Sequence, residues 1–284
     1  METNHKTSTN LPIRRPLTMV LVSSILCALL MAAASLAGLF FPEQVYSEEA
    51  LLHAFFVNDV VNLVIGLPIL IGSMWAAVRG KLLGLLLWPG ALLFIVYTYI
   101  VYVFAMPLNW AFLLHLLLLT LSIYTLISLL LTIKPESVQQ QLAGQVREKL
   151  CGGALIFLGL LMIAQVLGAL VGEISSRTGI SRADLALHTS DMILAPAWFV
   201  GGLLLWKRKP LGYVLSLGLL FQISMLFVGL LVLFLLEPFM LGVFFRTVDF
   251  IVIIIMGLPA FIPLGIFTRR IIKAGKSLKR NAAE

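Results

Sequence analysis

The sequence is short of charge. Only 12% of its 284 residues are Asp, Glu, Lys or Arg, whereas 61% are hydrophobic and the mean hydropathy is +1.06. A soluble domain is usually about one quarter charged, so this chain lacks the polar surface that would keep a globule in water. The composition therefore excludes an ordinary water-soluble fold.

Patterns typical of several other classes are also missing. The two cysteines, Cys27 and Cys151, form no C-x-x-C pair, which leaves a disulfide framework, a zinc site and a redox motif without support. The histidines show no H-x-x-H or E-x-x-H spacing, so no metal and no cofactor are predicted. No G-x-S-x-G motif and no Gly-rich phosphate loop occurs. Alternating strands of about ten residues, which a membrane barrel needs, are absent too.

What the chain has instead is a series of apolar runs, each long enough to cross a hydrocarbon core of about 30 Å. We predict an all-α polytopic integral membrane protein, a bundle of eight transmembrane helices. The predicted spans cover residues 17–41, 52–78, 82–105, 109–133, 151–173, 190–206, 211–236 and 242–268. The first span begins like a secretory signal, but its apolar run is longer than the 7–15 residues of a signal core, which favours a retained helix.

The basic residues are distributed unevenly between the spans. Of the 20 Lys and Arg, 17 fall in the N-terminal tail, in the connections after the second, fourth and sixth spans, and in the C-terminal tail. With eight spans these regions share one side, and the positive-inside rule makes that side, with both termini, cytoplasmic. We expect these cations to bind anionic lipid headgroups rather than nucleic acid. The absence of an N-x-S/T sequon is compatible with a prokaryotic plasma membrane.

The chain divides into two similar halves. Its predicted parts are a tail (1–16), four helices (17–133), a cytoplasmic loop (134–150), four more helices (151–268) and a basic tail (269–284). Segments 67–84 and 195–212 align without gaps at an offset of 128, which places Pro68 on Pro196. Four spans is an even number, so the pattern predicts two parallel repeats. Chance similarity between apolar helices rich in Gly and Pro is the alternative.

Seven polar or charged residues are predicted to lie one to two turns below the extracytoplasmic surface. They are Asn58, Asp59 and Asn62 in the second span, His188 and Asp191 in the sixth, and Arg246 and Asp249 in the eighth. Such groups belong against other helices or a hydrated cavity, because a charge that faces lipid is costly. We predict that they form a polar pocket for a small polar or ionic ligand, with Arg246 as the countercharge of Asp59.

A purely structural role is the alternative for each of these groups. Buried amides often hydrogen-bond across helix contacts, and the pair Arg246 and Asp249 can simply fix helix packing. We interpret five aromatic residues as an interfacial belt rather than as ligand contacts: Tyr97, Tyr99, Tyr102, Trp110 and Trp75.

Three function classes fit these features. The best supported is a transporter-like or small-ligand-binding bundle, which the repeat, the buried acids and expected helix breaks at Pro68 and Pro196 favour. The alternative is a non-catalytic sensory, regulatory or assembly subunit of a membrane complex. A membrane-embedded lipid or quinone enzyme that uses Asp59, His188 and Asp191 is the least supported, since no catalytic spacing accompanies these residues.

Overall fold

The computed structural model describes residues 11–46, 48–176 and 179–281. Eight of the helices in this part of the chain are long and apolar enough to cross a bilayer, so the chain is a multi-pass all-α membrane protein, as the sequence predicts. The helices of the first half are α1 (Thr18–Phe40), α2 (Pro42–Val45), α3 (Glu49–Val61), the π-helix η1 (Asn62–Gly66), α4 (Leu67–Val78), α5 (Leu82–Ala105) and α6 (Trp110–Thr132). They are followed by α7 (Pro135–Leu142), α8 (Glu148–Ser176), α9 (Arg182–Trp206), α10 (Pro210–Leu241) and α11 (Thr247–Asn281).

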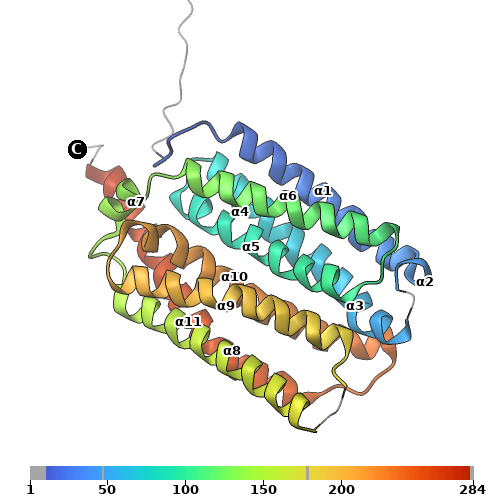
Figure 1. The fold of residues 1–284 in the computed structure, drawn as a ribbon. Coiled ribbons are helices and arrows are strands. Elements are labelled where there is room, and N and C mark those ends of the chain that lie inside the picture. Colours follow the sequence, from blue (N-terminus) through green and yellow to red (C-terminus); the bar gives the residue numbers. More distant parts are fainter. Residues whose placement is uncertain (1–10, 47, 177–178, 282–284) are drawn as a thin grey trace, which may run out of the picture.

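Helices α5 and α10 form the centre of the bundle. The helix α5 is buried along almost its whole length and contacts α4, α6, α9 and α10. In turn, α10 contacts α3, α9 and α11, while α1 packs on α3, α4 and α6, and α8 packs on α9 and α11 (Figure 1). The two halves of the chain therefore meet along α5 and α10.

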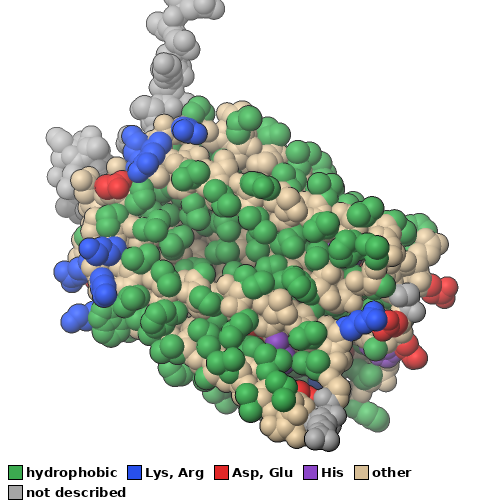
Figure 2. Space-filling view, viewed as in Figure 1, with side chains coloured by type: hydrophobic (Ala, Val, Ile, Leu, Met, Phe, Trp, Pro, Cys, Tyr) green, Lys and Arg blue, Asp and Glu red, His purple; other side chains and the backbone are tan. Residues whose placement is uncertain are grey.

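The two ends of the bundle differ in charge. The start of α1, the short helix α7 and the end of α11 lie together at one end, and α2 lies at the other (Figure 1). Lys and Arg side chains gather at the α7 end, whereas hydrophobic side chains cover the visible flank between the ends (Figure 2). An apolar flank of this kind requires a lipid bilayer around it. The helix α7 lies in the loop 134–150, where the sequence predicts no helix because the segment is polar and short.

The second span is not a continuous α-helix. Pro68 has no N–H to donate to the preceding turn, and just before it the Leu67 N–H bonds to the carbonyl oxygen of Asn62, five residues back. The expected break at Pro68 is therefore present as the π-helix η1. The helix α9 runs through Pro196 without interruption, so the break expected there was wrong.

The turns after α4 and α9 have the same geometry, 128 residues apart. Gly80 has a φ of 73° and Arg208 a φ of 53°, both in the left-handed region. The next residue, Lys81 or Lys209, donates its N–H to the carbonyl oxygen five positions earlier, at 3.1 and 2.8 Å. Both turns are thus Schellman-type helix ends.

Close helix contacts recur at the same offset. A Cβ at Gly84 would overlap α4, and a Cβ at the equivalent Gly212 would overlap α9. At the centre, a Cβ at Gly90 of α5 would overlap the carbonyl oxygen of Gly218 of α10, again 128 residues away. These equivalences support the predicted parallel repeat, in which the contact between Gly90 and Gly218 would lie on the axis.

Candidate functional site

The three polar residues of the second span have different surroundings. Asp59 on α3 is 1% exposed and Asn62, the first residue of η1, is 0% exposed. Asn58 is half-buried and lines a large cavity. Only Asn58 of the three therefore reaches the cavity directly.

Two tyrosines hold the Asp59 carboxylate. Tyr102 of α5 donates to Oδ1 at 2.9 Å, and Tyr46, which follows α2, donates to Oδ2. Gly38 of α1 leaves the space for this arrangement, since a Cβ there would overlap the carboxylate of Asp59. Burial and the neighbouring Asp59 carboxylate raise the pKa of Tyr46, so Tyr46 remains a donor. Asn58 donates to the hydroxyl of Tyr102 at 3.2 Å and so links this cluster to the cavity.

Aromatic rings enclose Tyr102. The rings of Phe55 and His115 lie 4.8 Å from it, centroid to centroid, and that of Tyr99 lies 5.3 Å away. Tyr99 and Tyr102 are buried, and Tyr97 also points into the bundle, so the interpretation of these tyrosines as an interfacial belt was wrong. The reason is that α5 is the central helix, and its faces meet protein rather than lipid.

Arg246 does not pair with Asp59. Its guanidinium contacts the Glu237 carboxylate at 2.9 Å and the Asp249 carboxylate at 3.9 Å, at the end of the bundle opposite α7. Phe234 also lies under it, with its ring 4.5 Å from the guanidinium carbon. The predicted pair was therefore wrong: similar depth placed Arg246 and Asp59 at the same level, but Asp59 is bound by Tyr46 and Tyr102, and Arg246 pairs with Glu237, which is closer along the chain.

A cavity of about 570 Å³ lies between the two halves of the chain. Helices α3 and α5 of the first half form part of its wall, and α8, α9, α10 and α11 of the second half form the rest. A smaller hollow between α8 and α11 shares Pro259 with it and extends toward the lipid-facing side. The cavity thus occupies the interface between the halves.

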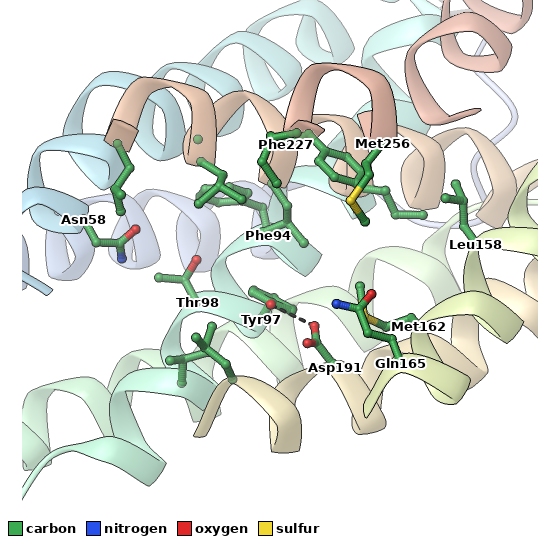
Figure 3. Close-up of a pocket in the computed structure, with 18 of the residues that line it drawn as sticks. Asn58, Phe94, Tyr97, Thr98, Leu158, Met162, Gln165, Asp191, Phe227 and Met256 are labelled. Atoms are coloured by element: carbon green, nitrogen blue, oxygen red, sulfur yellow. Dashed lines mark hydrogen bonds between the residues drawn. The ribbon is translucent and has the colours of Figure 1, made fainter. Parts of the chain in front are cut away.

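Most polar groups of the cavity lie on one side, and Asn58 of α3 lies apart from them (Figure 3). Tyr97 donates to Oδ1 of Asp191 at 2.8 Å, and Thr98 and Gln165 lie on the same side, as Figure 3 shows. The opposite wall, which α10 and α11 provide, consists of apolar side chains such as Phe227. The site is therefore mainly apolar, with a few polar groups, most of them on one wall, rather than polar throughout.

The other predicted site residues lie outside the cavity wall. His188 lies one turn before Asp191 on α9 and is close enough to interact with it electrostatically. Ser190, between them, donates to the Tyr97 carbonyl oxygen at 3.0 Å and fixes α9 against α5. Asp249 has a half-exposed side chain beside Arg246. Of the seven predicted residues, the structure thus brings Asn58 and Asp191 together around one space.

Several cavity residues were not predicted. Tyr97 carried a signal that could have identified it, since it begins the short polar stretch Tyr97, Thr98 and Tyr99 in an otherwise apolar span. Phe227 and Trp198 carried none, because an apolar residue that lines a cavity looks in sequence like one that packs in a core. Within the described ranges, no three His, Cys, Asp or Glu side chains come close enough to share a metal ion.

The charged residues of the cavity wall limit which ligands the cavity can bind. Asp191 is the one carboxylate among its described wall residues, and none of them is Lys, Arg or His.

Comparisons with protein-family models, with curated proteins and with solved structures find no match to this chain, so its ligand has to be inferred from this site.

Proposed function

We propose that the protein is a transporter-like bundle that binds a small molecule in this cavity, within the bilayer. The observation that carries the proposal is the position of the cavity at the junction of the two halves. Transporters built from repeats hold their substrates at such a junction, near the middle of the membrane. A volume of about 570 Å³ and mainly apolar walls with a few polar groups are also typical of small-molecule sites.

The packing of α5 and α10 supports access from the end that holds α2. Phe94 lines the cavity, and Gly90, one turn further toward the α7 end, meets Gly218 backbone to backbone. On α9 the wall residues extend from Ala183, in the first turn, to Trp198. Between α5 and α10 the cavity is therefore closed toward the basic end, which corresponds to the predicted extracytoplasmic opening if that end is cytoplasmic.

The proposal can be tested through Trp198, which lines the cavity and is 2% exposed. Replacement of the exposed Trp75, Trp110 and Trp206 by Phe leaves two buried indoles, of which only Trp198 borders the cavity, while Trp88 is buried elsewhere. In nanodiscs, a neutral brominated alcohol such as 10-bromodecan-1-ol should quench Trp198 with a saturable dependence on concentration. A further Trp198→Phe change should abolish that component.

A matched pair of alanines supplies the control. Ala54 on α3 and Ala164 on α8 are both exposed, but only Ala54 lines the cavity. Ala54→Phe should weaken the saturable quenching by occupying the space, and Ala164→Phe should leave it unchanged. Quenching that rises linearly with the probe in every variant, as simple collision in the lipid would give, would refute the proposed site.

A further inference from the structure

The wall of the cavity carries a carboxylate with an unused acceptor. Tyr97 occupies Oδ1 of Asp191, and no described residue donates a hydrogen bond to Oδ2. The wall residues from α10 and α11 are all apolar, and Gln165 is the polar residue that α8 contributes. An acid in apolar surroundings without a basic partner is costly to keep charged, unless a cation or a strong donor approaches it.

A second carboxylate lies just behind the wall. Asp59 follows the wall residue Asn58, and its hydrogen bonds come from Tyr46 and Tyr102, which are neutral. The described Lys and Arg side chains make no ion pair with it: Arg246 contacts Glu237 instead. The cavity therefore has acidic groups in and beside its wall, and no described Lys or Arg forms an ion pair with either of them.

Two basic residues lie beside the described wall, and the arginine is already paired. Arg182, next to the wall residue Ala183, contacts Glu48 at 3.1 Å. His188 is the titratable neighbour of Asp191 on the same helix, and it does not line the cavity. Neither side chain lies in the cavity wall itself.

The apolar part of the wall is rich in aromatic rings. Phe55 and Phe94 come from the first half of the chain, and Phe157, Trp198 and Phe227 come from the second. The face of an aromatic ring attracts a cation, and binding sites for quaternary ammonium groups are commonly built from such rings. A wall of aromatic rings around one carboxylate therefore favours binding of an apolar ligand that carries a positive charge.

We infer that the ligand of this cavity is a lipophilic cation: an apolar molecule that carries one ammonium or similarly diffuse positive centre. The charged centre would lie near Asp191 and the aromatic rings, and the apolar part would fill the space lined by α10 and α11. This inference rests on the proposed function, because it names the ligand class of the same site. It predicts that anionic molecules of the same shape are rejected.

Two ions of equal shape and opposite charge test the inference. In the nanodisc assay, tetraphenylphosphonium and tetraphenylborate compete with 10-bromodecan-1-ol for quenching of Trp198, after correction for the partitioning of each ion into empty nanodiscs. Tetraphenylphosphonium should displace the neutral probe at a free concentration about tenfold lower, or more, than tetraphenylborate. Asp191→Asn should remove most of this preference while the neutral probe still binds.

The matched control is Asp249→Asn, since Asp249 is half-exposed beside Arg246 and does not line the cavity. This variant should keep the preference for the cation. If the neutral probe binds but the two ions compete equally, or if Asp191→Asn keeps the preference, the inferred ligand class is wrong and the site stands. If neither the neutral probe nor the phosphonium ion reaches Trp198, the proposed function itself is wrong.

Discussion

Gly90 on α5 faces Gly218 on α10 with no side chain between their backbones. The two residues are 128 positions apart, which is also the separation of the matched turns at Gly80 and Arg208. Small residues let membrane helices approach closely, and dispersion attraction between the closely packed backbones replaces the hydrophobic drive that lipid does not supply. This pair of glycines joins the two halves of the chain and closes the cavity between α5 and α10.

Gly90→Ala should destabilise the protein. The added methyl would overlap the carbonyl oxygen of Gly218, so α5 and α10 must move apart, at a cost of about 1–3 kcal/mol in the free energy of unfolding. Thermal unfolding in detergent measures the effect. Gly72→Ala on α4 is the control, because an added Cβ there meets no atom within 4 Å. Equal unfolding midpoints for the two variants would show that the helices do not pack as described.

Tyr102→Phe should also lower stability, through the buried Asp59. Loss of the hydroxyl leaves Oδ1 of Asp59 without this donor in a site that is 1% exposed, which costs about 1–3 kcal/mol. Tyr124→Phe on α6 is the matched control, since Tyr124 is 68% exposed. If both changes have the same small effect on the thermal midpoint, the hydrogen bond to Asp59 is not formed in the folded protein.

Asp59 and Arg246 should behave independently. Arg246→Ala breaks a pair with Glu237, whose side chain is 15% exposed, and should cost about 1 kcal/mol or more. Because Asp59 has other partners, the losses for Asp59→Ala and Arg246→Ala should add within about 0.5 kcal/mol in the double variant. Chemical unfolding of the two single variants and the double variant gives the coupling. A coupling above about 1 kcal/mol would restore the pair expected from sequence.

The sequence predicted the membrane spans well and the side-chain contacts poorly, because the two depend on different features of the sequence. Apolar length fixes the spans because the bilayer sets a minimum run of about 20 residues, so α5 was predicted at its observed bounds, 82–105. The same pattern indicates how deep in the membrane a side chain lies, but it does not indicate which neighbouring side chain it contacts. For that reason Asp59 and Arg246 were placed at one level yet paired wrongly, and Tyr102 was assigned to the surface.

The orientation of the bundle remains a prediction that cysteine accessibility can test. In a background with Cys27→Ser and Cys151→Ser, a single cysteine at Glu49 or at Gln140 places a thiol at an exposed position near each end. A membrane-impermeant maleimide applied to intact cells should label Glu49→Cys and not Gln140→Cys, because basic residues stay on the cytoplasmic side. Labelling of Gln140→Cys alone would invert the orientation and the expected opening of the cavity.

The most direct test of the central claim is to identify what occupies the cavity in protein extracted from its native membrane. Protein transferred straight into nanodiscs, then denatured and examined by mass spectrometry, should release a specific small molecule in near-stoichiometric amount. Ala164→Phe should retain this molecule and Ala54→Phe should lose most of it, because only Ala54 lines the cavity. The same molecule recovered in equal amount from both variants, or none from the wild-type protein, would contradict a ligand-binding role for this site.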